Sequence, residues 1–139
     1  MTVAGQKKMR RSVKGMQALD LKFDAIISSP YMRARQTAEI VAQVYKLKIK
    51  TIYLTNNLLP PASIEELLHE VNTHFPKSKN ILLVGHEPHL TEMICSLLKC
   101  PTPLNIDLKK GGLCALSLQQ KDATLNWLLT PLQLVLLAR

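Results

Sequence analysis

Two short apolar runs in the sequence each give way to a proline and then to a helical pattern, and this repeated junction constrains the fold more than any other feature. One run ends at Ser28 and is followed by Pro30; the other covers Ile81 to Val84 and is followed by Pro88. Apolar runs of this length are typical of strands inside parallel sheets, and proline favours the first turn of a helix. The pattern therefore predicts two strand-to-helix junctions whose polar residues meet beyond the carboxyl ends of the strands.

The remaining pattern alternates helices with strands along the chain. Thr2 can cap a first helix, because Met9, Val13 and Met16 recur on one face of it. This alternation predicts an α/β fold, in one domain spanning residues 1–139, with a mainly parallel sheet covered by helices on both faces. The expected strands lie at Asp24 to Ser28, Thr51 to Leu54 and Ile81 to Val84. The other expected helices are one capped by Ser29, with Pro30 at its first position and an end at about Tyr45, one opened by the capping box Ser63 to Glu66 and continuing to Phe75, and one that begins at Pro88 and ends before Pro101. A hairpin of Leu113 to Leu118 and Thr124 to Leu129 is expected around the loop Gln119 to Ala123.

The chain is strongly basic, with a formal net charge of +8. Such a charge favours acidic partners, among them phosphate groups, phosphoproteins and nucleic acid, although solubility alone explains it equally well. The cluster of Lys7, Arg10, Arg11 and Lys14 is most simply the solvated face of the first helix. Aromatic residues make up 4% of the chain and do not alternate with basic residues as base-stacking surfaces require, so we do not expect a nucleic-acid-binding protein.

Cysteine usage and the chain ends indicate a cytoplasmic protein. The three cysteines lack the spacing of a disulfide framework or a zinc site, which favours free thiols in a reducing compartment. No apolar run follows the basic residues near the beginning, as a secretory signal would require. The apolar tail from Leu125 to Ala138 is too short to span a bilayer, so we expect no membrane insertion. The sequence leaves the oligomeric state open.

Arg33 and His86 are the candidate functional residues at the two junctions. Arg33 falls in the first turn of its expected helix, where free backbone N–H groups and the helix dipole also attract anions. Its guanidinium can donate two parallel hydrogen bonds to a phosphoryl group, and His86 can donate to the same group or move a proton near neutral pH. A surface arginine and a hydrogen-bonded histidine in a tight turn are the structural alternatives.

The other histidines and a glycine pair carry weaker signals. His86 and His89 have a spacing that can invite a metal, but no carboxylate or thiolate motif completes the site, so we expect none. His69 and His74 fit the surface of their helix. The segment Lys109 to Gly112 could line the rim of the cleft, although it is more often an ordinary basic turn.

The segments around the two candidate residues resemble motifs of a known family. Ser28 to Ala38 reads SSPYMRARQTA, and Leu83 to Pro88 reads LVGHEP. They resemble the second and third motifs of the histidine phosphatase superfamily, specifically its phosphohistidine phosphatase branch, SixA. The likeness extends from the opening TVAGQ through LKKGGL to the closing NWLLTP. It implies a phosphoglycerate mutase-like α/β fold, in which Arg33 clamps the phosphoryl oxygens and His86 donates to them and stabilises the charge of the transition state.

The resemblance also implies a covalent mechanism. In that family a histidine of an Arg-His-Gly motif on the first, central strand attacks phosphorus, and water then releases phosphate without a metal or cofactor. No Arg-His-Gly occurs in these 139 residues. We therefore expect an N-terminally truncated reading of a longer phosphatase that lacks its first central strand and its nucleophile. The nucleotide sequence upstream of Met1 would test this expectation.

The activity that the resemblance implies is removal of phosphate from histidine on a signalling or phosphotransfer protein. Larger family members use a carboxylate between the two motifs to protonate the leaving group. Thr51 to Ser63 contains no acidic residue, which fits the SixA branch, because a protonated imidazole leaves with less help. Glu65 and Glu66 are better explained by helix capping. The alternative is an inactive pseudophosphatase that binds phosphoprotein with the remaining half of the pocket.

Overall fold

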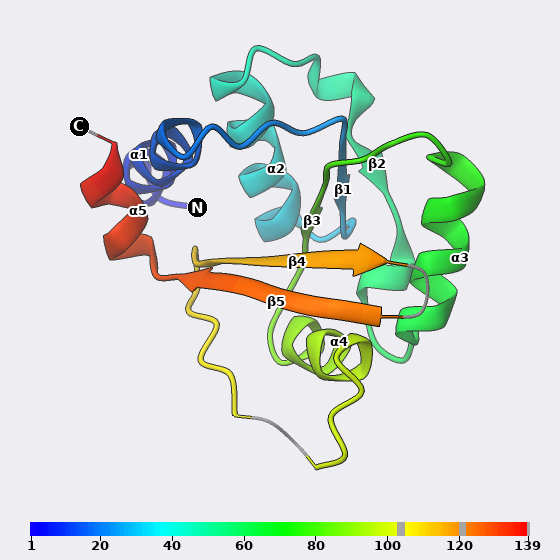
Figure 1. Cartoon of the computed structure of the whole chain (residues 1–139). Coiled ribbons are helices and arrows are strands. Elements are labelled where there is room, and N and C mark those ends of the chain that lie inside the picture. Colours follow the sequence, from blue (N-terminus) through cyan, green and yellow to red (C-terminus); the bar gives the residue numbers. More distant parts are fainter. Residues whose placement is uncertain (103–104, 120–121, 139) are drawn as a thin grey trace.

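A three-stranded sheet lies between two groups of helices in the computed structural model of the chain (Figure 1). The structure describes residues 1–102, 105–119 and 122–138. The α/β fold predicted from the sequence is confirmed. In order, the described elements are α1 (Val3–Ala18), β1 (Ala25–Ser28), α2 (Met32–Val44), the 3-10 helix η1 (Ile49–Thr51), β2 (Tyr53–Leu54), the 3-10 helix η2 (Asn56–Leu58), α3 (Ile64–His74), β3 (Ile81–Val84), α4 (His89–Leu97), β4 (Leu113–Gln119), β5 (Asp122–Leu129) and α5 (Pro131–Leu137).

β1 is the central strand of the parallel sheet, whose strand order is β2-β1-β3. Ala25 pairs with Ile81 and Ser28 pairs with Val84, so β1 and β3 end at the same level. The Ser29 N–H continues this pairing by donating to the Val84 carbonyl oxygen at 3.0 Å. Both predicted strand-to-helix junctions therefore open at one edge of the sheet. In the described part of the chain, no strand pairs with the outer edge of β3.

Each face of the sheet carries its own hydrophobic core. Successive residues of a strand point to opposite faces. Ile26 packs into a cluster with residues of α1, α2 and α5, whereas Ile27 packs into a second cluster with residues of α3 and α4. Helices thus cover both faces, as the sequence predicts. Leu113 and Leu129, which pair at the open end of the β4–β5 hairpin, pack against the first cluster.

α5 packs against α1 at very short range, at one flank of the molecule (Figure 1). A Cβ atom placed on Gly15 of α1 would lie 1.9 Å from the carbonyl oxygen of Leu134 in α5. Any side chain at this position would overlap the α5 backbone, so glycine is required for the close approach. Leu134 itself is 1% exposed and belongs to the first cluster. Gly15 therefore sets the distance between the first and last helices.

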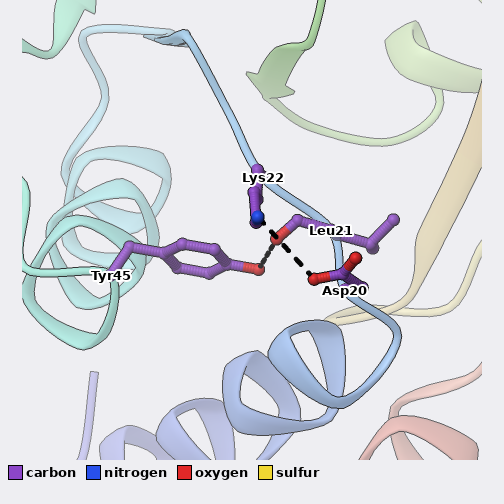
Figure 2. Close-up of polar contacts among 4 residues, drawn as sticks. All are labelled: Asp20, Leu21, Lys22 and Tyr45. Atoms are coloured by element: carbon purple, nitrogen blue, oxygen red, sulfur yellow. Dashed lines mark hydrogen bonds and ion pairs between the residues drawn. The ribbon is translucent and has the colours of Figure 1, made fainter.

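The end of α2 is tied to the segment that follows α1 (Figure 2). Tyr45 Oη donates to the carbonyl oxygen of Leu21 at 2.8 Å, and its ring centroid lies 5.3 Å from that of Phe23. Burial raises the pKa of Tyr45 to about 12, so the hydroxyl keeps its proton and remains a donor near neutral pH. The neighbouring ion pair of Lys22 and Asp20 is solvent-exposed at 4.0 Å and contributes little to stability.

The start of α2 differs from the sequence prediction. The helix begins at Met32 with Tyr31 as its N-cap residue, so the prediction that Ser29 caps it with Pro30 in its first turn is wrong. A tertiary contact explains the difference, because the Ser29 side chain is buried against His86 and does not cap the helix. By contrast, the capping box that opens α3 is confirmed.

Two other boundaries also differ. The predicted strand at Thr51 to Leu54 is confined to β2, because Ile49–Thr51 forms the tighter turns of η1. The terminal hairpin is confirmed with slightly longer strands, and residues 120–121 of its predicted loop lie outside the described residues.

The sequence analysis did not predict α5. Thr130 Oγ1 accepts the N–H of Gln133 while the Gln133 side chain accepts the N–H of Thr130, and Pro131 occupies the first turn. This reciprocal capping turns the apolar tail into a helix. Within the described ranges, no helix combines the length and the apolar character needed to cross a membrane.

Candidate active site

His86 lies beyond the end of β3 and is joined to the end of β1 by a hydrogen bond. The distance between its Nε2 and Ser29 Oγ is 2.6 Å. Ser29 is 0% exposed, and its Oγ also accepts the N–H of Tyr31 at 3.3 Å. The Tyr31 ring packs on the imidazole, with 5.5 Å between the ring centroids. Two residues of the junction between β1 and α2 therefore hold the ring of a histidine that belongs to the junction after β3.

The surroundings of His86 favour its neutral form. Burial lowers the pKa of the ring below its ordinary value, and the positive charges of Arg33 and His89 lower it further. Because Ser29 Oγ already accepts the Tyr31 N–H, its own O–H is available to donate to Nε2 of the neutral ring. When Ser29 Oγ donates to Nε2, the ring proton resides on Nδ1, which can then donate to a ligand.

Arg33 lies in the first turn of α2, as predicted, and its side chain is exposed. Among the described residues, its guanidinium has no hydrogen-bond or ion-pair partner. Arg33 lies two residues after Tyr31, whose ring packs on His86, so both predicted site residues lie at the same edge of the sheet. The first N–H groups of a helix also lack intrahelical acceptors and attract anions. This combination of donors is suited to bind a tetrahedral oxyanion such as phosphate.

The remaining histidines do not extend this arrangement into a metal site. His89 is 5% exposed at the start of α4, and its Nε2 has no hydrogen-bond partner among the described residues. No group of three or more His, Cys, Asp or Glu side chains suited to hold a metal occurs in residues 1–102, 105–119 and 122–138. His69 and His74 lie exposed on α3, as expected, and the His74 ring packs against Tyr53 at 5.1 Å.

The segment Lys109 to Gly112 forms a turn beside α1 and α5. The Gly112 N–H donates to the Lys109 carbonyl oxygen at 2.7 Å, and Gly111 adopts a positive φ of 81°. A Cβ atom on Gly111 would contact Met9 of α1 and Pro131 of α5. These contacts are typical of an ordinary turn, and a place at the rim of the cleft stays a prediction.

Ser29 and Tyr31 are residues of this site that sequence reasoning did not assign to it. The available signal was the pair Ser28-Ser29 at the end of an apolar run, which local rules assign to helix capping. Ser28 Oγ donates to the Ser29 carbonyl oxygen at 2.8 Å, and both serines are fully buried. The contact of Ser29 with His86 bridges 57 positions of sequence and could not be predicted from local patterns.

Replacing Arg33 by methionine is expected to raise the pKa of His86 toward its ordinary value. The variant removes one of the two positive charges that disfavour the imidazolium, while burial of the ring persists. An NMR titration of the His86 ring measures the midpoint. Arg35→Met removes an exposed arginine from the same helix and is expected to leave that midpoint in place. Equal shifts in the two variants would contradict the placement of Arg33 beside His86.

Similarities to known proteins bear on the family and the fold of the chain. A family model of the histidine phosphatase superfamily (branch 1) matches residues 1–53. An uncharacterized protein of Picosynechococcus sp. is 31% identical over 118 residues, which make up 84% of this chain and 70% of that protein. The chain belongs to the histidine phosphatase superfamily.

Solved phosphatase structures share the fold of this histidine phosphatase superfamily member. The protein histidine phosphatase SixA complexed with tungstate matches it with a TM-score of 0.81 at 19% identity, over 96% of this chain and 85% of that one. A putative alpha-ribazole-5'-P phosphatase from Escherichia coli K-12 matches with a TM-score of 0.76 at 18% identity, over 94% and 84% of the two chains. These similarities establish the phosphoglycerate mutase-like α/β fold, and they include phosphatases of different substrates.

Proposed function

We propose that this histidine phosphatase superfamily member acts on phosphohistidine carried by a signalling or phosphotransfer protein in the cytoplasm, with Arg33 and His86 holding the phosphoryl group. The proposal is carried by the Ser29–His86 hydrogen bond of 2.6 Å, which fixes the imidazole within reach of the Arg33 charge. The likeness in fold to SixA, a protein histidine phosphatase, supports the same substrate class. A net charge of +8 favours encounter with a negatively charged phosphoprotein.

The residues of this chain supply the electrostatic half of the reaction. The Arg33 guanidinium donates two parallel hydrogen bonds to phosphoryl oxygens, and His86 donates from Nδ1 to a neighbouring oxygen. As the P–N bond of the substrate breaks and a bond from phosphorus to the nucleophile forms, both donors stabilise the charge on the phosphoryl oxygens. The family resemblance assigns the attack to a histidine of an Arg-His-Gly motif, which this sequence does not contain.

Two of the three glutamates of α3, Glu66 and Glu70, are engaged in structural contacts, and Glu65 is exposed. Glu66 Oε2 accepts the Ser63 N–H at 3.3 Å as part of the α3 capping box. Glu70 accepts hydrogen bonds from Tyr53 at 2.7 Å, from Asn57 at 2.9 Å and from Thr55. These contacts support a substrate whose leaving group needs no acid from this part of the protein. Protonated imidazole, the leaving group of phosphohistidine, meets that condition.

Binding of phosphoprotein without turnover is the second candidate function. It is favoured by one observation, the absence of Arg-His-Gly from the sequence. Both candidates use Arg33 and His86 to hold the phosphoryl group. They differ in whether phosphate is released.

Arg33→Ala is expected to weaken the binding of inorganic phosphate by about tenfold to a hundredfold, because it removes a bidentate, charge-assisted pair. Titration calorimetry of the chain with phosphate at low salt measures the affinity. Arg35→Ala is the matched control, since it removes the same charge from an exposed position of the same helix. Unchanged affinity in Arg33→Ala would reject the assignment of this site.

Incubation of a version extended to include an Arg-His-Gly strand with a radiolabelled phosphohistidine protein separates the two candidate functions. Release of phosphate that is lost in both Arg33→Ala and His86→Ala supports the phosphatase. Retention of the labelled phosphoprotein without release supports binding alone. A chain that neither binds nor dephosphorylates this protein would reject both.

A further inference from the structure

A groove of about 420 Å³ lies between α1 and α5, outside the candidate active site. We call it the α1–α5 groove. Its walls are formed by Ala4, Lys7, Lys8 and Arg11 of α1 and by Leu132 and Val135 of α5. Figure 1 shows the two helices side by side at one flank of the molecule, next to α2.

The wall formed by α1 is basic. Its residues recur at i, i+3, i+4 and i+7, which places them on one stripe of the helix. The sequence of α1 contains five basic residues and no acidic residue. Within the described ranges, Lys7, Lys8 and Arg11 take part in no ion pair. The positive charge of this wall is therefore uncompensated.

The wall formed by α5 is apolar and exposed. Leu132 of this wall is 66% exposed, although it lies on a helix whose Leu134 is buried, and Leu136, one turn further along α5 and outside the groove lining, is 50% exposed. Val3, one residue before the Ala4 end of the groove, is 75% exposed. A solvated basic helix face, which the sequence analysis favoured for α1, does not explain why large apolar side chains line the opposite wall. Exposed apolar surface bordered by charge is typical of protein interaction sites.

We propose that the α1–α5 groove binds an acidic amphipathic helix of a partner protein. The charge complementarity is specific to such a helix, because its acidic side would meet the α1 wall and its apolar side would meet the α5 wall. A concave groove with two chemically different walls suits a helix better than a flat lipid surface. This binding goes beyond the proposed phosphatase activity and does not depend on phosphoryl chemistry.

The groove also has a defined direction relative to the active site. The Met1 amino group donates to Gln36 Oε1 at 3.1 Å, whereas Gln17 Nε2 donates to the Val44 carbonyl oxygen at 3.3 Å, so the start of α1 lies beside the first half of α2 and its end lies beside the end of α2. The Ala4 end of the groove therefore points toward the end of the molecule where α2 begins. A helix held there would place its protein on the side of Arg33.

An 18-residue fluorescent peptide with glutamates on one helical face and leucines on the other is a suitable probe. Fluorescence anisotropy in low-salt buffer measures its affinity for the full chain. Lys7→Glu/Lys8→Glu is expected to weaken binding about tenfold, since two ion pairs become two repulsions. Lys48→Glu/Lys50→Glu changes the net charge equally at exposed positions outside the groove, and we expect less than about a twofold effect because salt screens distant charges.

A second pair of variants tests the apolar wall without a change of charge. Leu132→Gln is expected to weaken peptide binding several-fold, whereas Leu118→Gln, at a similarly exposed leucine of β4, is expected to have no effect. Circular dichroism confirms that each variant is folded. Phosphate affinity should be unchanged in all four variants, so a failure here is distinguishable from a failure of the proposed function.

Three outcomes would overturn the docking proposal. Equal losses in the two double charge reversals would show that only the overall field attracts the peptide. Equal losses in the two leucine variants would show that the apolar wall is not involved. Binding of phosphatidylglycerol vesicles through Lys7 and Leu132, without binding of the peptide, would assign the groove to a lipid surface.

Discussion

Gly15→Ala is expected to lower the free energy of unfolding by about 3 kcal/mol, the upper part of the range for overpacking a tight contact. The added Cβ would lie 1.9 Å from the Leu134 carbonyl oxygen, a distance that no pair of non-bonded atoms tolerates. The atom it meets belongs to the α5 backbone, so relief requires the two helices to move apart. Leu134 is 1% exposed, and such a movement would open the first hydrophobic cluster.

The sign of this effect is opposite to the intrinsic preference of a helix. Alanine in place of glycine within a helix is ordinarily stabilising by about 0.5–1 kcal/mol. Gly5→Ala provides the matched control in the same helix, because its Cβ would meet only side-chain atoms of Met1 and Thr2 at 3.2 Å. Urea denaturation of both variants measures the difference. A Gly15→Ala protein as stable as Gly5→Ala would contradict the close crossing of α1 and α5.

Glu70→Ala is expected to cost about 2–3 kcal/mol of stability. Glu70 on α3 accepts hydrogen bonds from Tyr53, Thr55 and Asn57, which lie in and after β2. Thr55 is 6% exposed, so loss of the carboxylate leaves a buried hydroxyl without this acceptor. Glu65→Ala, at an exposed position of the same helix, is the control and is expected to change stability by less than about 1 kcal/mol.

The contribution of Glu70 is also expected to depend on pH. Burial raises the pKa of this carboxyl, but the hydrogen bonds from Thr55, Tyr53 and Asn57, together with the charge of His74, outweigh burial and leave the pKa lowered. A carboxyl with a lowered pKa in the folded state stabilises the protein above its unfolded pKa, and this stabilisation is lost as the pH falls through the folded value.

Glu70→Gln isolates this pH dependence, because glutamine does not titrate. The difference in free energy of unfolding between the parent and Glu70→Gln should be constant near neutral pH and should shrink as the pH falls below the ordinary range of a carboxyl. Urea denaturation at a series of pH values measures it. A difference that does not change with pH would show that the hydrogen bonds to Glu70 do not require its charge.

The fold could be predicted where local signals act alone. The apolar runs at Ala25–Ser28 and Ile81–Val84 form strands, and the Ser63–Glu66 capping box opens a helix, because these signals lie within a few residues of the elements they specify. The missed helix α5 carried a similar signal. Thr130 and Gln133 form a capping box around Pro131. The apolar residues that follow were interpreted as a tail, so the capping box was not recognised as the start of a helix.

The candidate site could be predicted only in part, for a physical reason. The positions of Arg33 and His86 at strand-to-helix junctions followed from the sequence pattern, and the structure brings them together. The partner of His86 could not be predicted, because Ser29 has two possible roles that local sequence does not distinguish. As a helix cap it would face solvent and donate nothing to the cleft. Tertiary packing instead buries it against an imidazole 57 residues away.

Ser29 contacts β3 through its backbone and His86 through its side chain, so the position of His86 depends on the register of β1 and β3. The Ser29 N–H continues the pairing of β1 with β3 through the Val84 carbonyl oxygen, while the Ser29 side chain reaches His86. A slip of one residue between these strands would turn the serine side chain to the other face of the sheet. The native contact between Ser29 and His86 therefore forms only when the two strands are in their native register, so the proposed phosphate site is assembled when the pairing of β1 with β3 is complete.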